Sequence, residues 1–390
     1  MEQWKEYRLE DFIHFNPTIS LKKGTVARKI AMDNLIPHSR KIYSWSIEPY
    51  SGGAKFQNGD TIMARITPCL ENGKHSYVSI LDEGEIAYGS TEYIVMRGIN
   101  GISNNLFIYY LSQYSKFKNA AVKSMVGSSG RQRAQVDVLK NLAFNLPGVT
   151  EQKRIADFLS SLDDKIELNR QINDNLEQQA QALFNHYFVE NTELLGEYDE
   201  VSLLDIASYT NGLAMQKYRP SEDVTSYLPV MKIKELGQGF TDSNSDICTC
   251  NIPEIYIINS GDIIFSWSGT LMVKIWCGET AGLNQHLFKV YSESYEKWFY
   301  YFWTKYHLRK FINIAKDKAV TMGHIKREDL AKSKVILPNQ ATLQNLNKIF
   351  SPIMDSIINN EIESKQQVQL RDTLLPRLMS GELKINEINN

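Results

Sequence analysis

The chain has 390 residues, 43% of them apolar and 23% charged, which is enough for two or three globular domains. Its formal net charge of -2 excludes a uniformly basic nucleic-acid-binding protein, so any basic surface must be local. The four cysteines include no CxxC pair, which predicts a cytoplasmic protein without structural zinc. No apolar run approaches the ~18 residues of a membrane span, so we expect no membrane anchor.

The chain begins with short β-branched and aromatic runs separated by Gly, Asn and Asp. Residues 61–66 and 91–96 are typical of strands in an α/β unit. The run at 106–122 has the apolar spacing of an amphipathic helix, and a Leu-Pro pair ends this part of the chain at Pro147. A second α/β unit follows, with predicted strands at 254–259 and 262–267 and a predicted amphipathic helix at 298–315.

These elements belong to a long internal repeat, whose Leu-Pro pairs end 191 residues apart at Pro147 and Pro338. Residues 59–62 match 261–264, 106–114 match 298–306, and 136–147 match 327–338. Because three blocks match in one order, the sequence predicts a tandem duplication.

A coiled-coil seam follows each Leu-Pro pair. Apolar and Asn residues alternate at steps of four and three from Ile155 to Tyr187, and a matching seam runs from Leu346 to Leu378, with a drift at Ser364, Gln367 and Arg371 that suggests a stutter. The internal pseudosymmetry predicts that the two helices pair antiparallel. Asn169 and Asn360 occupy equivalent seam positions, where they either fix the register or face solvent.

The motifs of nucleotide binding, methyl transfer and metal binding are missing. No GxxxxGK[ST] loop, GxGxxG turn, Asn-Pro-Pro-aromatic tetrapeptide or HExxH motif occurs. The Glu-x-Lys fragment at 363–365 resembles part of a nuclease motif, but its helical context predicts a solvent-facing stretch. We therefore expect no catalytic residue, no metal site and no cofactor on this chain.

Basic charge is concentrated in two stretches at equivalent places in the repeat. Residues 115–145 hold six basic side chains against one acid, and residues 303–335 hold nine against three. One such stretch is as consistent with a solvated helix as with a binding surface, but their recurrence favours two contacts with duplex DNA.

A polar loop lies within each basic stretch, at 127–135 and at 321–326, and supplies side chains suited to base edges and phosphates. In the first half the candidate DNA contacts are Arg65, Thr91, Glu92, Ser128, Ser129, Arg131, Gln132 and Arg133. In the second half they are Ser268, Thr270, Asn284, Gln285, His286, Lys316, Lys318, Thr321, His324 and Lys326.

The ends of the two halves resemble a known family. The segment from Leu146 to Phe184, LPGVTEQKRIADFLSSLDDKIELNRQINDNLEQQAQALF, and the terminal LRDTLLPRLMSGELKI resemble the conserved regions of specificity subunits of type I restriction–modification enzymes. One departure is Thr342-Leu343, where the resemblance leads one to expect Glu-Gln. The resemblance covers the whole chain, but the recognition domains of the family vary too much for any base contact to be carried over.

This resemblance implies an α+β fold in which two tandem α/β target-recognition domains are separated by two long antiparallel coiled-coil helices. The expected segments are recognition domain 1 at 1–148, helical spacer 1 at 149–190, recognition domain 2 at 191–338 and helical spacer 2 at 339–390. Each recognition domain would read one half of a split, asymmetric site in double-stranded DNA, with the helices setting the spacing.

The implied partners are two methyltransferase subunits, which would carry S-adenosylmethionine and flip the target adenine out of the duplex, and restriction subunits with a translocase motor. Two alternatives remain open at this point. One is a non-enzymatic architectural or regulatory protein that binds a two-part DNA site, and the other is a self-contained restriction or modification enzyme, against which the missing motifs argue.

Overall fold

The computed structural model of the chain describes residues 4–221, 226–317 and 324–388. Its contacts divide the chain into two units, of which unit 1 comprises Met1–Lys165 and Gln367–Asn390 and unit 2 comprises Ile166–Gln366. Each unit therefore contains a stretch of both long helices, and the end of the chain belongs with its beginning.

Unit 1 is built on two four-stranded sheets and a two-stranded ribbon. The first sheet, in the order β2-β9-β6-β7, is antiparallel, whereas the second, β4-β3-β8-β5, contains the parallel pair β3–β8. The ribbon pairs β1 with β10. The strands are β1 (Lys5–Arg8), β2 (Ile13–Phe15), β3 (Val26–Ile30), β4 (Ser46–Pro49), β5 (Lys55–Phe56), β6 (Thr61–Ala64), β7 (His75–Tyr77), β8 (Ala87–Gly89), β9 (Tyr93–Gly98) and β10 (Ala143–Leu146).

Unit 2 repeats this topology strand for strand. Its sheets have the orders β12-β19-β16-β17 and β14-β13-β18-β15, the second again with one parallel pair, β13–β18, and β11 pairs with β20. The strands are β11 (Tyr198–Ser202), β12 (Ser208–Asn211), β13 (Tyr227–Met231), β14 (Ile247–Thr249), β15 (Ile257–Ile258), β16 (Asp262–Ser266), β17 (Met272–Trp276), β18 (Ala281–Leu283), β19 (Leu287–Tyr291) and β20 (Lys334–Pro338). The predicted tandem α+β repeat is confirmed.

The helices are α1 (Asn105–Gln113), α2 (Ser115–Lys123), α3 (Val136–Lys140), α4 (Val149–Asn185), α5 (Leu203–Ile206), α6 (Ile233–Gln238), α7 (Lys297–Asp317), α8 (Arg327–Ala331), α9 (Gln340–Ser380) and α10 (Ile385–Ile388). Among the helices, α3 corresponds to α8 and α4 to α9, whereas two helices, α1 and α2, stand at the place of α7. The single helix predicted at 106–122 is wrong, because the backbone leaves the helical region at Tyr114 (ψ 130°) and separates α1 from α2. At this break between α1 and α2, the Tyr114 ring contacts the ring of Phe144 in β10 at 6.3 Å between centroids.

The core of unit 1 lies between its antiparallel sheet and the long helices. Side chains of β6, β9 and α1 are buried together with Ile155 and Leu159 of α4 and with Leu374 and Leu378 of α9. These helix residues are 0–8% exposed, so the C-terminal part of the chain completes the first core.

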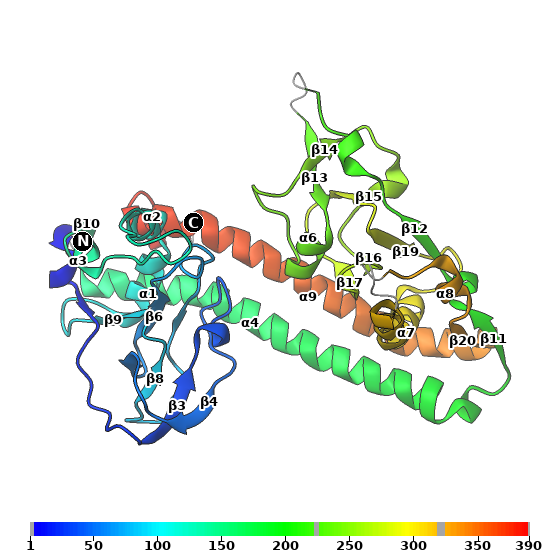
Figure 1. Cartoon of the computed structure of the whole chain (residues 1–390), viewed down its shortest axis with the longest axis horizontal. Coiled ribbons are helices and arrows are strands. Elements are labelled where there is room, and N and C mark those ends of the chain that lie inside the picture. The colour runs from blue at the N-terminus through cyan, green and yellow to red at the C-terminus, as the bar shows by residue number, and fades with distance from the viewer. Residues whose placement is uncertain (1–3, 222–225, 318–323, 389–390) are drawn as a thin grey trace. The chain divides into compact units, whose positions relative to one another are not determined.

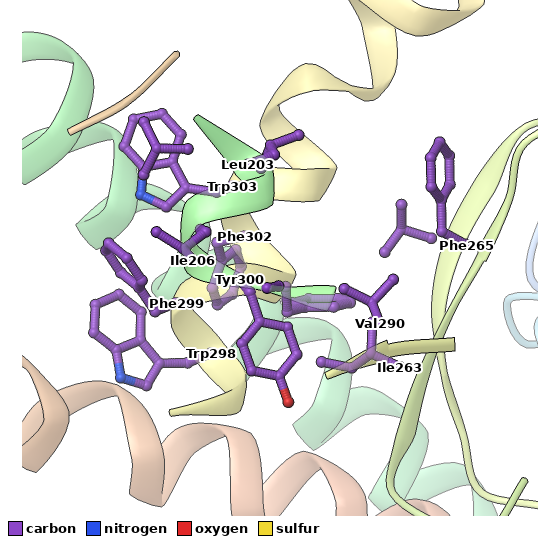
Figure 2. Packing of buried hydrophobic residues seen from close by; sticks show 14 of the residues in the cluster. Leu203, Ile206, Ile263, Phe265, Val290, Trp298, Phe299, Tyr300, Phe302 and Trp303 are labelled. Carbon is purple, nitrogen blue, oxygen red and sulfur yellow. The ribbon is translucent and has the colours of Figure 1, made fainter. Parts of the chain in front are cut away.

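The core of unit 2 is rich in aromatic rings. Figure 2 shows Trp298, Phe299, Phe302 and Trp303 of α7 beside Leu203 and Ile206 of α5, with Ile263, Phe265 and Val290 on the sheet. On the other side of α7, the Trp298 ring stacks on Phe350 of α9 at 4.2 Å between centroids. Helix α7 thus attaches the sheet of unit 2 to α9 (Figure 1).

The two long helices are antiparallel within unit 2, where their seam is polar. Asn169 Nδ2 donates to Glu363 Oε2 at 2.8 Å, whereas Asn173, one turn further along α4, donates to the Ile357 carbonyl at 3.0 Å. Asn360 Nδ2 in turn donates to Asn173 Oδ1 at 2.9 Å. Asn169 is 1% exposed, so of the two possibilities for this position, solvent exposure is wrong. A buried amide layer restricts the pairs of helix positions that can face each other.

Residues 363–365 correct another expectation of the sequence. Instead of facing solvent, Glu363 accepts the hydrogen bond from Asn169, and Lys365 donates to the carbonyl of Gly239 and lies 5.0 Å from the Trp276 ring. Burial lowers the pKa of Lys365. Glu363 therefore holds α9 against α4 and Lys365 holds it against the domain of unit 2, roles that the helical pattern could not show.

Candidate nucleic-acid interface

In unit 1 the structure brings the predicted polar loop onto the end of strand β6. The Ala134 amide donates to the Arg65 carbonyl at 2.8 Å, and the Thr67 amide donates to the Gln132 carbonyl at 3.0 Å. Arg65 follows β6 directly, and its own amide donates to the carbonyl of Glu92, which precedes β9. Three segments far apart in sequence are therefore fixed side by side by backbone hydrogen bonds.

The side chains of these segments form what we call the first cluster: Arg65, Glu92 and Arg133. Arg133 Nε donates to both carboxylate oxygens of Glu92 at 3.0 and 2.9 Å, and its Nη2 donates to Oε1 at 2.8 Å. Arg65 Nε lies 3.6 Å from Glu92 Oε2. The hydrogen bonds from Arg133 lower the pKa of Glu92, so the carboxylate stays charged. All three side chains remain between 23% and 39% exposed and thus open to a ligand.

Unit 2 places three other side chains at the same backbone positions. The Ile325 amide donates to the Trp267 carbonyl at 3.0 Å, as the Ala134 amide does to Arg65. Strand register pairs Ala64 with Tyr93 and Ser266 with Leu287. One residue beyond these pairs lie Arg65 and Glu92 in unit 1 and Trp267 and His286 in unit 2.

The third position of this second cluster, Trp267, His286 and His324, follows from isolated backbone pairs. Ile66 pairs with Arg133, and Ser268 pairs with His324. The rings of both histidines lie 6.1 Å from the Trp267 ring. An Arg-Glu-Arg group in one domain is thus replaced by a Trp-His-His group in the other, and the two clusters present different chemistry to a ligand.

The remaining candidates of the first half lie on the segments that carry the first cluster. Thr91, Ser128, Ser129 and Arg131 are exposed, and Gln132 is half-buried with its carbonyl bound to Thr67. The loop closes on itself, since the Arg131 amide donates to the Ser128 carbonyl at 3.0 Å. All eight candidates of unit 1 lie on three neighbouring segments.

The candidates of the second half are more scattered. His286 is contacted by Ser268 Oγ at 3.2 Å and by Gln285 Nε2 at 3.4 Å, and Asn284 Oδ1 accepts from its amide at 3.3 Å. Ser268 and Asn284 are buried, so they position His286 through these hydrogen bonds instead of contacting a ligand themselves. Thr270 and Lys326 are exposed near the cluster and Lys316 is exposed in the last turn of α7, whereas Lys318 and Thr321 lie outside the described residues.

Several lysines of the two basic stretches face the protein instead of solvent. Lys118 of α2 is half-buried, and burial lowers its pKa. Lys305 of α7 is also half-buried and binds Glu177 of α4, whereas Lys334 stays exposed and forms a surface ion pair with Glu200 at 2.5 Å. The basic stretches are therefore only partly available to a polyanion.

Sequence reasoning missed Trp267 and its surroundings. Trp267 Nε1 donates to Asn211 Oδ1 at 2.9 Å, and the ring borders a hollow of about 550 Å³. The hollow is lined by Tyr209, Thr210, Asn211, Tyr256, Trp267, Phe288, Ile325 and Arg327. The available signal was a tryptophan directly after a buried strand, at the place that Arg65 occupies in the first half.

Other kinds of site are not found among the described residues. No group of three or more His, Cys, Asp and Glu side chains there could hold a metal ion, and the four cysteines are free thiols. Within residues 4–221, 226–317 and 324–388, no helix combines the length and apolar character of a membrane span.

The fold and the clusters define a tandem-repeat recognition protein, with two copies of one α/β domain attached to long helices and a different exposed cluster on each copy. Comparison with known families specifies this class. The chain belongs to the family described as the type I restriction modification DNA specificity domain, whose model matches residues 1–178 and 196–371. Its role is therefore that of the DNA-recognition subunit of a type I restriction–modification system.

Named relatives agree with this family. The chain is 26% identical to the type I restriction enzyme MjaIX specificity subunit of Methanocaldococcus jannaschii, covering 72% of this chain and 70% of that protein. It is 23% identical to the HindI specificity subunit of Haemophilus influenzae, covering 98% and 100%. The crystal structure of the type I S subunit from M. genitalium is similar in fold, with a TM-score of 0.52 at 16% identity over 97% of this chain and 96% of that one.

Proposed function

We propose that unit 1 and unit 2 each read one half of a split, asymmetric site in double-stranded DNA. The observation that carries this proposal is the pair of clusters, which occupy the same backbone positions on two copies of one fold but differ in all three side chains. A duplicated scaffold brings the same positions to its ligand in both copies. Different side chains at those positions therefore select different base edges.

The partners of this function are subunits that act on the DNA. We propose that two methyltransferase subunits bind this chain, and that restriction subunits with a translocase motor join the complex in the cytoplasm. On this proposal the chain has no catalytic step of its own, and S-adenosylmethionine binds the methyltransferase. The absence of the Asn-Pro-Pro-aromatic and GxGxxG motifs from the sequence supports this division of labour.

The direct test is to sequence the sites that the assembled complex modifies. The complete chain is combined with the methyltransferase of its own system, and adenine methylation is mapped on genomic DNA. The expected result is one motif with two defined half-sites and an undefined gap. A single continuous motif, or methylation without sequence preference, would contradict the proposal.

Calorimetry tests the division of labour. The chain alone is titrated with S-adenosylmethionine at micromolar concentration, and no saturable heat is expected. One-to-one binding would show that the chain carries a cofactor site of its own.

A further inference from the structure

Arg133 is held by the protein along one side of its guanidinium group and is open along the other. Nε and Nη2 donate to Glu92, and Nη1 donates to the Arg131 carbonyl at 3.3 Å. A guanidinium group has five N–H donors. Within the part of the chain that the structure describes, one N–H on each terminal nitrogen is left for a ligand. Two such N–H groups on the terminal nitrogens of one guanidinium can donate side by side to the O6 and N7 acceptors of guanine.

The backbone that carries Arg133 is constrained on both sides. The amide and the carbonyl of Arg133 both bond to Val126, at 3.0 and 3.1 Å, and the next residue, Ala134, is 1% exposed. Gly127 adopts φ +139°, and a Cβ there would lie 2.9 Å from the Arg131 carbonyl oxygen, so this tight turn requires glycine. With the backbone fixed and the carboxylate attached, little rotational freedom of Arg133 is left to be lost on binding.

We propose that Glu92 is a positioning residue that presents the terminal edge of Arg133 to a guanine in the half-site read by unit 1. The proposal rests on the function proposed above and names one base for one domain. It also distinguishes the domains, since His324 occupies the position of Arg133 in unit 2 and has no guanidinium edge to offer. The guanine contact therefore belongs to the first half-site.

A phosphate is the other ligand of an arginine, and the surroundings of Arg133 favour a base. Glu92 is 23% exposed, and its carboxylate offsets one of the two positive charges of the first cluster, which weakens the attraction of this cluster for a phosphate group. The same carboxylate improves recognition of a base edge, because it fixes the plane of the guanidinium and leaves two directed donors. Lys316, exposed in the last turn of α7, represents the opposite arrangement, because its ammonium is a point charge that does not present a fixed pair of donors.

The test is selection from a duplex library in which both half-sites are randomised, using the complete chain with its methyltransferase. Wild type, Arg133→Lys, Arg133→Ala and Glu92→Gln are compared. The matched control is Glu48→Gln, which removes a carboxylate from an ion pair of similar length with Lys29 (2.8 Å) in the second sheet of unit 1. His324→Ala perturbs the equivalent position of unit 2.

We expect a G·C pair in the wild-type motif whose preference falls roughly 5- to 150-fold in both Arg133 variants, the range of a lost bidentate contact. Glu92→Gln should lower the preference at that same pair by roughly fivefold or more and leave the other positions intact. Glu48→Gln should not change the motif, and His324→Ala should alter only the other half-site. A role of Glu92 in folding alone would not change the preference at one base pair.

Three outcomes would overturn the inference. The motif could lack a G·C pair that responds to Arg133, or Glu92→Gln could retain the full preference. Arg133→Ala could also weaken binding to every sequence alike and lower the salt slope by about one unit, which is the behaviour of a phosphate contact. If wild type selects no two-part motif at all, the proposed function has failed, and that result is distinct from a two-part motif that does not respond to Glu92.

Discussion

Arg371 and Asp163 form a buried ion pair at the point where the helix seam loses its apolar pattern. Arg371 Nη1 donates to Asp163 Oδ1 at 2.7 Å, and the two side chains are 10% and 7% exposed. Tyr110 Oη donates to Asp163 Oδ2 at 2.6 Å, and burial raises the pKa of Tyr110, so its phenol keeps the proton that it donates. The predicted stutter is therefore occupied by a satisfied polar group in unit 1.

Replacing one partner of this pair should be much more costly than replacing both. Arg371→Met leaves the Asp163 carboxylate buried, and removing one member of a buried pair costs about 3–5 kcal/mol. The lower end is expected here, since the hydrogen bond from Tyr110 remains and Arg40 Nε lies 3.9 Å from the carboxylate. Adding Asp163→Asn removes the uncompensated charge and keeps an acceptor for Tyr110, so the double variant should recover most of the loss.

Hydrogen exchange by mass spectrometry measures this effect in unit 1 alone. Peptides from 149–165 and 374–380 should lose about 3 kcal/mol of opening free energy in Arg371→Met and about 1 kcal/mol in the double variant. Peptides from α7 in unit 2 serve as the internal control and should not change. Equal protection in Arg371→Met and wild type, or a double variant as unstable as the sum of the single changes, would refute the account of a buried, coupled charge pair.

Three further predictions concern pH, the polar seam and phosphate contacts. Burial lowers the pKa of His75 to about 3, whereas a histidine in an unfolded chain has a pKa near 6.5. Between these two pH values the unfolded state binds more protons than the folded state, so the stability of the fold decreases as the pH is lowered. Unit 1 should lose about 2 kcal/mol between pH 7 and pH 5 in a urea titration followed by hydrogen exchange, and an equally steep loss in His75→Gln would assign it to other groups. Asn173→Leu should lower the stability of unit 2 by roughly 1–3 kcal/mol, because the Asn360 amide loses its acceptor, and adding Asn360→Leu should restore stability. The measurement is the hydrogen-exchange protection of peptides 340–366, and a double variant that is no more stable than Asn173→Leu would contradict the prediction. Lys316→Ala should weaken binding to all DNA sequences alike and lower the slope of the logarithm of the binding constant against the logarithm of salt concentration by about one unit. Lys140→Ala is the control, because its ammonium already binds Asp137 at 3.1 Å, and a similar drop in this variant would show that the slope does not report single phosphate contacts.

The sequence by itself determined the repeat and the class of fold. The 191-residue period aligns β20 with β10, α8 with α3 and α9 with α4, and each of these elements begins 191 residues after its counterpart. The long seam also follows from the sequence, because side chains at steps of three and four lie on one face of a helix whatever surrounds it. Ile155, Leu159 and Leu162 are buried as this periodicity predicts.

Side chains whose surroundings come from other parts of the chain were not predictable in the same way. Lys118 and Lys305 count as basic surface in the sequence, but in the structure each is half-buried, and Lys305 binds Glu177 of α4. Arg371 disrupts an apolar pattern and is nevertheless buried, because Asp163 pairs with its charge and Tyr110 donates a hydrogen bond to Asp163. Local pattern reports the type of a side chain, whereas the free energy of burying a charge depends on its partner.

The clusters show most clearly what only the tertiary structure decided. Arg133 and His324 are 191 residues apart, in register with the repeat, but Arg65 and Trp267 are 202 apart, because 68 residues lead from Arg65 to Arg133 and only 57 lead from Trp267 to His324. No single offset in the sequence aligns both pairs. The matched block at 59–62 and 261–264 has the offset of Arg65 and Trp267, but no matched block contains Glu92 or Arg133. The backbone hydrogen bonds of the sheets do align them, since strand register fixes which residues are neighbours irrespective of the length of the loops between the strands.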